Sequence, residues 1–271
     1  MTDRAGARGI WTDREFLSGV QYAAPGNLAA RQSIYAFQQP RLQMYAWALD
    51  LAGLTGDETV VDIGCGNGRY LAALEKRGHS GLVVGLDISV GMLAVARSGA
   101  PHASVAEADA TALPLRSGTV DCALAMHMLY HVPEPELAVA ELRRVTRPGG
   151  ATLVVLNQAP HLEELRSLMN AALVEAGEQP RYSTMGRLDV DEGRRLLEGA
   201  FDSVSVHDQQ AELVVTDAEA VVAYLGSTNV VQAGIATNLG ALRVVRRMVQ
   251  ERIGEHGAFR VATRTGCLVC R

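Results

Sequence analysis

Lysine is almost absent from this sequence. Among the 271 residues, 25 are basic, and only Lys76 is a lysine; the formal net charge is −5. No segment is rich in lysine and arginine, so the electrostatic footprint of a nucleic-acid-binding protein is missing. We therefore expect no nucleic acid partner.

Long hydrophobic runs are also missing. No uncharged apolar segment approaches the length of a membrane span, and residues 1–8 are too polar for the apolar region of a signal peptide. The sequence predicts a cytoplasmic protein with no stable membrane association. The oligomeric state cannot be predicted from these features.

Cysteine is scarce, and its four positions do not form a disulfide framework. Cys267 and Cys270 stand three residues apart within an apparent strand over 259–270. Residues three apart on a strand point to opposite faces, which is poor geometry for a shared metal ion. We predict that both pack in the protein interior and that the protein has no metal site.

A glycine-rich loop is the strongest motif present. The apolar, β-branched run 59–63 predicts a buried strand, Gly64, Gly66 and Gly68 follow, and a helical pattern begins at Tyr70. Glycines at these positions allow positive φ and let a ligand lie directly on the backbone. A loop that merely turns the chain remains an alternative.

The spacing of this loop and the acid before it indicate the kind of ligand. The glycines do not follow the dinucleotide fingerprint, and no Lys-Ser or Lys-Thr pair follows, as a phosphate loop requires. Asp62 stands two residues before Gly64, where a carboxylate would repel a pyrophosphate and suit an ammonium group. A positively charged nucleoside without phosphate, such as S-adenosylmethionine, fits best.

Strand and helix patterns alternate five times over about 100 residues, as in a doubly wound parallel sheet. Further strands are expected over 81–86, 103–106, 120–126 and 151–156. Polar residues stand where these strands end: Asp87 after the second, Asp109 after the third, and His127 after the fourth. An open α/β sheet holds its ligands at these carboxyl ends.

The ordered motifs of residues 58–157 resemble those of class I S-adenosylmethionine-dependent methyltransferases, in the branch of ubiquinone/menaquinone-type and small-molecule enzymes. The matching positions are Asp62, Gly64, Gly66, Gly68, Asp87, Asp109, Tyr130-His131-Val132-Pro133 and Arg147-Pro148-Gly149-Gly150. The resemblance implies a Rossmann-like, seven-stranded sheet, mostly parallel with an antiparallel last strand. Segments 203–207 and 259–270 would supply its sixth and seventh strands.

The same resemblance implies a division of the chain and a set of cofactor contacts. Residues 1–57 would form a helical lid, 58–157 the S-adenosylmethionine-binding core, and 158–271 the rest of the sheet with substrate-cap helices, all within one catalytic domain. Asp87 would bind the ribose hydroxyls, although it also suits a helix N-terminus. Asp109 and the Ala110 N–H would bind the adenine. The expected cofactor-binding residues are Asp62, Gly64, Cys65, Gly66, Gly68, Asp87, Ile88, Met92, Asp109, Ala110, Met126 and Arg31.

The segment before the first strand predicts two helices. These are expected over 28–37 and 41–51, separated by Pro40. Asn27 is the expected N-cap of the first. Tyr22, Asn27 and Arg31 are spaced to cluster near the start of that helix, either as a capped surface or as residues that close the site.

The catalytic candidates are His131, His127 and Tyr22. Methyl transfer depends mainly on alignment, and a base is needed only where the acceptor must lose a proton. His131 titrates near neutrality and follows the fourth strand, which makes it the leading candidate. A structural or cofactor-proximal role for His131 remains open, and His127 could line the methionine moiety instead.

The sequence favours an oxygen or nitrogen atom of a small molecule as the methyl acceptor. The high content of Ala, Arg and Gly suggests a GC-rich bacterial genome, where such enzymes often modify secondary metabolites. A quinone or lipid C-methyltransferase is one alternative, and a non-catalytic S-adenosylmethionine-binding regulator is another. The N/D-P-P-Y/F motif of some macromolecular methyltransferases is absent after the fourth strand.

Overall fold

The computed structural model describes residues 9, 11–180, 188–233 and 235–271, without the side chains of 230, 233 and 235–238. In this part of the chain one eight-stranded sheet has the order β1-β7-β8-β6-β5-β2-β3-β4. The strands are β1 (Gln38–Gln39), β2 (Val60–Ile63), β3 (Val83–Asp87), β4 (Ser104–Glu107), β5 (Val120–Met126), β6 (Thr146–Asn157), β7 (Val204–Val215) and β8 (Phe259–Cys270).

The order of the strands confirms the predicted fold class. Strands β2 to β6 pair in parallel, and β8 lies antiparallel between β6 and β7. The chain runs from β2 outward through β3 to β4, and then returns to place β5 on the other side of β2. This reversal opens a crevice at the carboxyl ends of β2 and β5, where ligands bind in such sheets.

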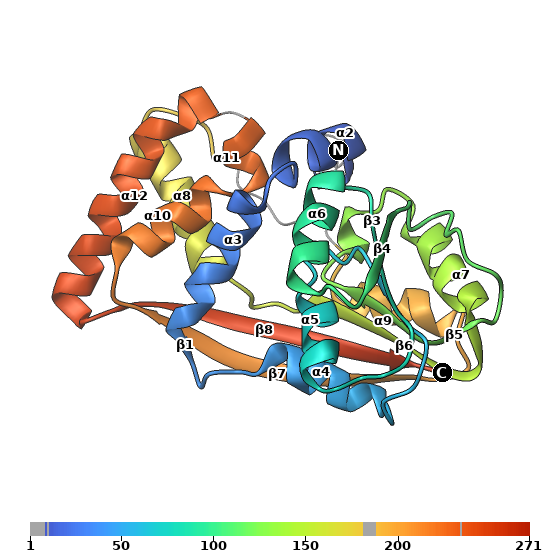
Figure 1. The fold of residues 1–271 in the computed structure, drawn as a ribbon. Helices are drawn as coiled ribbons and strands as arrows, with labels where there is room; N and C mark the ends of the chain where they lie inside the picture. Colours follow the sequence, from blue (N-terminus) through green and yellow to red (C-terminus); the bar gives the residue numbers. More distant parts are fainter. Residues whose placement is uncertain (1–8, 10, 181–187, 234) are drawn as a thin grey trace.

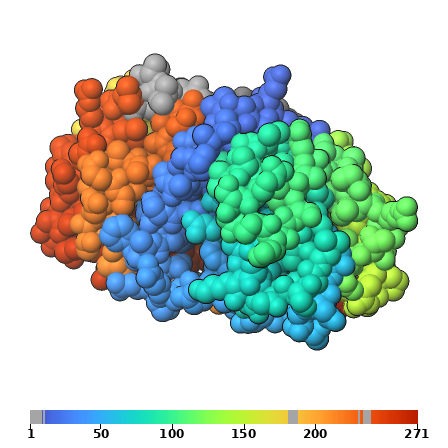
Figure 2. All heavy atoms as spheres, viewed as in Figure 1, coloured from blue at the N-terminus to red at the C-terminus, as the bar shows by residue number. Residues whose placement is uncertain are grey.

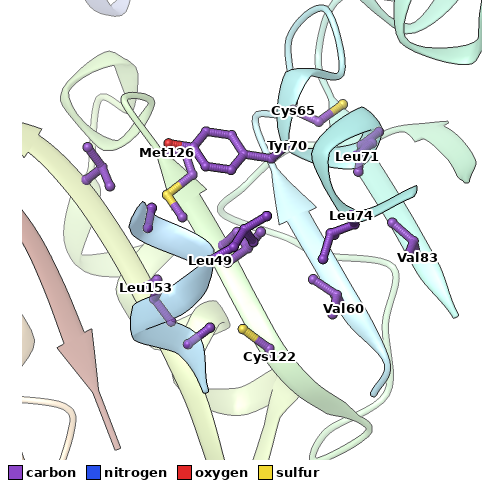
Figure 3. Packing of buried hydrophobic residues seen from close by; sticks show 14 of the residues in the cluster. Leu49, Val60, Cys65, Tyr70, Leu71, Leu74, Val83, Cys122, Met126 and Leu153 are labelled. Atoms are coloured by element: carbon purple, nitrogen blue, oxygen red, sulfur yellow. The ribbon is translucent and has the colours of Figure 1, made fainter. Parts of the chain in front are cut away.

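Helices cover both faces of the parallel strands (Figure 1). The helices are α4 (Met44–Ala52), α5 (Arg69–Lys76), α6 (Val90–Gly99), α7 (Pro135–Val145) and α9 (Val190–Glu198). Leu153 packs with α4 and α5 on one face, while its neighbour Val154 packs with α7 on the other. Both are fully buried, as the alternation of side chains along a strand requires. Figure 3 shows Leu49, Leu71 and Leu74 gathered over Val60 and Cys122 in the first of these cores.

A third core lies beside the sheet. Strands β7 and β8 pair over twelve positions and extend past β6 to underlie a group of helices (Figure 1). These are α8 (Glu163–Glu175), α10 (Ala218–Gly226), α11 (Asn229–Ala233) and α12 (Ile235–His256). Leu213, Val215 and Phe259 of the extended strands pack against α8, α10 and α12. We call these four helices the cap helices.

The two C-terminal cysteines divide between the two faces of the sheet. Cys267 packs in the core beneath α4 and α5, and Cys270 packs in the core beneath α7 and α9. Both are free and fully buried. The expectation that they pack inside, on opposite faces, is confirmed.

The N-terminal segment differs most from expectation. It contains α2 (Arg14–Phe16), a π-helical turn (Leu17–Gln21), α3 (Pro25–Ser33), a 3-10 turn (Ile34–Phe37) and then β1. The predicted N-cap at Asn27 is wrong, because α3 begins at Pro25 and Ala24 is its N-cap. Asn27 lies inside the helix, and its side-chain amide donates to the Gln21 carbonyl at 3.4 Å.

One additional strand and two element boundaries also depart from the predictions. Strand β1 adds an eighth strand to the expected seven, and β7 extends eight residues beyond His207. The second N-terminal helix starts at Met44 instead of Arg41. The expected loop over 179–187 lies mostly outside the described residues. No described helix has the length and apolarity that a bilayer-spanning helix needs.

Gly68 allows a test of close packing between α5 and α6. Its φ is +77°, and a Cβ there would approach the Ala96 Cα of α6 to 2.8 Å. Gly78 has the same backbone conformation (φ +73°) but open space around the missing Cβ. We predict that Gly78→Ala lowers the free energy of unfolding by about 1 kcal/mol through its positive φ, and that Gly68→Ala costs at least about 1 kcal/mol more. Urea unfolding of both variants measures the difference; equal losses would show that the contact with α6 adjusts freely.

Candidate functional site

A cavity of about 1230 Å³ opens at the carboxyl ends of the parallel strands. The predicted site residues line it with one exception, Gly68, which packs against α6 instead. The N-terminal segment crosses the molecule between the cap helices and the core on the face seen in Figure 2. The volume exceeds that of a typical pocket for one small ligand, so it can hold a cofactor and an acceptor together.

The glycine loop has the backbone that its spacing predicts. Gly64 and Gly66 have φ of +69° and +52°, and a Cβ on Gly64 would come within 2.7 Å of Met128. The Gly66 N–H donates to the Asp87 carboxylate at 2.8 Å, which joins the loop to the end of β3. The loop is therefore fixed from two sides, and its exposed backbone faces the cavity.

Asp62 is a buried acid without a partner. It is 1% exposed, and neither carboxylate oxygen has a hydrogen-bond partner among the described residues. Burial raises the pKa of Asp62 well above its usual range, and the nearby Asp87 raises it further. An orphaned carboxylate on a cavity wall is costly unless a ligand pairs with it, and an ammonium group is the natural partner. This chemistry fits the methionine end of S-adenosylmethionine.

Asp87 already serves the protein backbone. Its second oxygen accepts from the Ser89 N–H at 2.8 Å, while the Ser89 hydroxyl caps α6 by accepting from the Met92 N–H. Burial raises the pKa of Asp87, although the hydrogen bonds from the Ser89 and Gly66 N–H groups oppose this shift. Ser89, and not Asp87, is the cap. The Ile88 N–H also lowers the pKa of Asp87, so only part of the capacity of the carboxylate, which has about four lone-pair sites, remains for a ribose hydroxyl.

Asp109 interacts both with a neighbouring residue and with one far away in the sequence. One oxygen accepts from the Thr111 N–H and hydroxyl, at 2.9 and 2.8 Å. The other forms an ion pair with Arg14 of α2. If Asp109 accepts from an adenine amino group, its carboxylate binds both the adenine and Arg14. The ion pair with Arg14 therefore attaches the N-terminal segment to the expected adenine end of the site.

His131 and Tyr22 form a hydrogen-bonded pair. The Tyr22 hydroxyl lies 3.0 Å from His131 Nε2, and His131 Nδ1 lies 2.9 Å from the Trp11 carbonyl oxygen. Because a carbonyl oxygen only accepts, Nδ1 carries a proton, and in the neutral ring Nε2 accepts from the tyrosine. The tautomer that could receive a further proton at Nε2 is therefore set by the backbone of Trp11.

His127 has a different character. Its backbone is in the left-handed region, with φ +58°, which is uncommon for a residue other than glycine. Burial lowers its pKa to about 4, so the ring is neutral at neutral pH and is a weak base. Such a ring suits contact with a ligand better than proton abstraction.

Several polar residues of the cavity carried no sequence signal. Asn157 of β6, Thr265 of β8 and Gln209 of β7 are direct neighbours across three strands, and all three line the cavity. The sequence predicts each of these strands separately and does not give the register in which they pair. Only that register shows that the three residues are neighbours. Tyr35 and His161 meet at 3.5 Å in the same cavity, and Tyr224 lines it as well.

Comparison with known proteins agrees with this geometry. A methyltransferase domain model matches residues 61–154. The ubiquinone/menaquinone biosynthesis C-methyltransferase UbiE of Salmonella arizonae is 31% identical over 176 residues, which cover 62% of this chain and 68% of the relative. This chain belongs to the class I S-adenosylmethionine-dependent methyltransferases.

Two further relatives show how far the likeness extends. The demethylmenaquinone methyltransferase of Renibacterium salmoninarum is 34% identical over 129 residues, which are 47% of this chain; the chain spans only 53% of that relative. A phosphoethanolamine N-methyltransferase of Haemonchus contortus, solved with phosphomonomethylethanolamine and S-adenosylhomocysteine, shares the fold. Its TM-score is 0.58 at 17% identity, over 95% of this chain and 59% of that one. The cofactor of this methyltransferase family is S-adenosylmethionine.

The buried carboxylate of Asp62 predicts proton release on cofactor binding. Without a ligand its raised pKa favours the protonated acid, and an ammonium group beside it favours the carboxylate. Release should therefore occur below the raised pKa of the free protein and vanish as the pH rises above it. Calorimetric titration with S-adenosylhomocysteine in buffers of different ionisation enthalpy measures the number of protons.

Two controls isolate the residue and the ligand group. Asp62→Asn cannot release a proton, and 5′-methylthioadenosine lacks the amino-acid part that would pair with Asp62. We expect neither to show the buffer-dependent enthalpy. The same proton release from Asp62→Asn would place its source elsewhere.

Proposed function

We propose that this protein transfers the methyl group of S-adenosylmethionine to an oxygen or nitrogen atom of a small molecule, such as a bacterial secondary metabolite. The observation that carries the proposal is the Tyr22–His131 pair. It joins the N-terminal segment to the turn after β5, in the wall of the cavity that Asp62 also lines. A hydroxyl or ammonium acceptor must lose a proton, and this pair offers a route for it.

The cofactor half of the cavity is proposed as follows. Asp62 would pair with the ammonium of the methionine part, Asp87 would accept from the ribose, and Asp109 with Ala110 would meet the adenine. Cys65, Gly64 and Gly66 would contact the ligand through the loop, and Ile88, Met92 and Met126 would supply apolar surface around it. Bound there, S-adenosylmethionine supplies a methyl group on a positively charged sulfur.

The proposed mechanism uses Tyr22 and His131 as a relay. S-adenosylmethionine would supply the methyl group, and the acceptor proton would pass to the Tyr22 oxygen. Tyr22 gives its own proton to His131 Nε2 along the existing 3.0 Å contact. The Trp11 carbonyl accepts from Nδ1–H and so stabilises the imidazolium that forms. Alignment in a closed cavity supplies much of the remaining acceleration.

Residues 1–57 are proposed as a lid, 58–157 as the cofactor core, and the cap helices with the extended strands as the acceptor side. Trp11, Leu28 and Arg31 of the N-terminal segment line the cavity, and a Cβ on Gly66 would meet Leu28 at 3.6 Å. These contacts place the segment directly over the glycine loop.

Quinone C-methylation is the second candidate function. It is favoured by the 31% identity to the Salmonella enzyme. The row Asn157, Thr265 and Gln209 counts against a long isoprenoid chain on that side of the cavity, since an apolar tail would bury amides without partners. A non-catalytic S-adenosylmethionine-binding protein would keep the cofactor acids and lack turnover.

Cofactor binding tests the central part of the proposal. We predict measurable affinity for S-adenosylmethionine and S-adenosylhomocysteine by calorimetry, and Asp87→Ala should weaken it by about 1–3 kcal/mol. Because Asp87 also anchors Gly66, urea unfolding of the free variant is the control for a loop that has lost its anchor. An undetectable affinity of the wild-type protein for both ligands would overturn the proposed function.

Removal of the Tyr22 hydroxyl tests the relay. With any hydroxyl or amine acceptor found by a coupled assay of S-adenosylhomocysteine release, Tyr22→Phe should lower kcat by about 10²-fold or more, the usual contribution of proton transfer. Cofactor affinity should stay unchanged. His131→Asn should cost a similar factor, and the double variant little more, because the two act as one unit. Full activity of Tyr22→Phe would contradict the relay and leave alignment alone as the source of rate.

A further inference from the structure

Arg31 is a half-buried cation that forms no ion pair with an acid among the described residues. It lies on α3 and lines the cavity, and its Nη2 atom is buried with no hydrogen-bond partner among the described residues. Its guanidinium carbon stands 5.0 Å from the centre of the Tyr22 ring.

The surroundings of Arg31 are phenols. Burial lowers the pKa of Arg31, while Tyr22, Tyr224 and Tyr130 raise it more strongly. Tyr22 is in contact with the guanidinium, and Tyr130 and Tyr224 line the same cavity. Hydroxyls and a planar guanidinium are together the donor set that binds a carboxylate or a phosphate.

None of the acids among the described residues that line the cavity forms an ion pair with Arg31. Asp62, Asp87 and Asp109 stand at the strand ends of the proposed cofactor half. Glu163 pairs with Arg166 at 3.1 Å, and Asp189 caps α9 by accepting from the Glu192 N–H. Among the described lining residues, no further acid is present to balance Arg31.

Arg31 also lies beside the proposed reacting groups. Tyr22 contacts it with its ring and contacts His131 with its hydroxyl. The sequence suggested Arg31 as a cofactor contact, but its position against Tyr22, without an ion pair to any described acid, favours the acceptor half. A ligand held by Arg31 would have its other end close to the relay.

We infer that the methyl acceptor carries an acidic group, a carboxylate or a phosphate, which Arg31 binds with the help of the neighbouring tyrosine hydroxyls. This inference rests on the proposed function and specifies its acceptor class. The acidic group anchors one end of the acceptor at α3, so that its oxygen or nitrogen nucleophile reaches the Tyr22 hydroxyl. A neutral analogue would leave the guanidinium buried and unpaired, which makes the preference for an anion strong.

Matched ligand pairs test the inference. The protein is loaded with S-adenosylhomocysteine and titrated with small hydroxy and amino carboxylates, each paired with its primary amide, and with phosphomonoesters, each paired with its alcohol. We expect the acidic member of at least one pair to bind at least tenfold more tightly than its neutral partner. The two series distinguish carboxylate from phosphate as the natural group.

Two arginine variants assign the preference to one residue. Arg31→Gln should abolish the preference, whereas Arg41→Gln, which removes the same charge from an exposed residue that lines the same cavity, should retain it. Arg31→Lys should retain part of it, since the charge remains and the planar donor pair is lost. Binding of no acidic probe, or an undiminished preference in Arg31→Gln, would overturn the inference.

Cofactor affinity separates the remaining outcomes. Arg31→Gln should bind S-adenosylhomocysteine as tightly as the wild type. A tenfold loss for S-adenosylhomocysteine without a loss for 5′-methylthioadenosine would assign Arg31 to the cofactor carboxylate and overturn the inference, while the proposed function stands. Failure of the wild-type protein to bind S-adenosylhomocysteine would instead overturn the proposed function itself.

Discussion

The hydrogen bond from the Gly66 N–H to Asp87 is the interaction on which the site depends. It joins the loop after β2 to the end of β3, so that these two neighbouring strand ends form one continuous wall of the cavity. The parallel register of β2 and β3 places the two groups in reach of each other. The Gly64 and Cys65 N–H groups also donate to the Leu86 carbonyl, at 2.7 and 3.0 Å, so the Asp87 bond completes the attachment of the loop to β3.

The wall has an electrostatic cost that a ligand can offset. Asp87 lies close enough to raise the pKa of Asp62, and Asp62 has no hydrogen-bond partner among the described residues. Burying a charge without a partner is unfavourable by several kcal/mol, which is why the protonated form is favoured in the free protein. Arg31 presents the opposite case at another part of the cavity. Among the described residues, neither Asp62 nor Arg31 forms an ion pair, and each is suited to a ligand group of opposite charge.

The core of the fold could be predicted because its signals are local. The run 59–63, the alternate glycines and Ser89 before a helical pattern each determine a short stretch of backbone, and the observed β2, glycine loop and α6 follow them. Helix α7 starts at Pro135 and β5 spans 120–126 as expected. Asn27 failed as a cap because Pro25 begins the helix two residues earlier, where its fixed φ and missing N–H suit the first turn.

The site could be predicted in part. Residues that end consecutive strands were found, since parallel strands bring their carboxyl ends together. The row Asn157, Thr265 and Gln209 depends on register across three strands, and the ion pair of Asp109 with Arg14 joins residues 95 positions apart in sequence. The hydrogen bond from Tyr22 to His131 spans a similar separation, and it specifies a tautomer that no spacing could indicate.

The extended pairing of β7 and β8 has a consequence for how such a protein diversifies. The same two strands complete the cofactor sheet at one end and carry the cap helices at the other. Substitutions among the cap helices would therefore reshape the proposed acceptor side while the glycine loop and its acids keep their positions. On that proposal, a change of acceptor need not disturb the binding of the methyl donor, because the two lie at opposite ends of the β7–β8 pair.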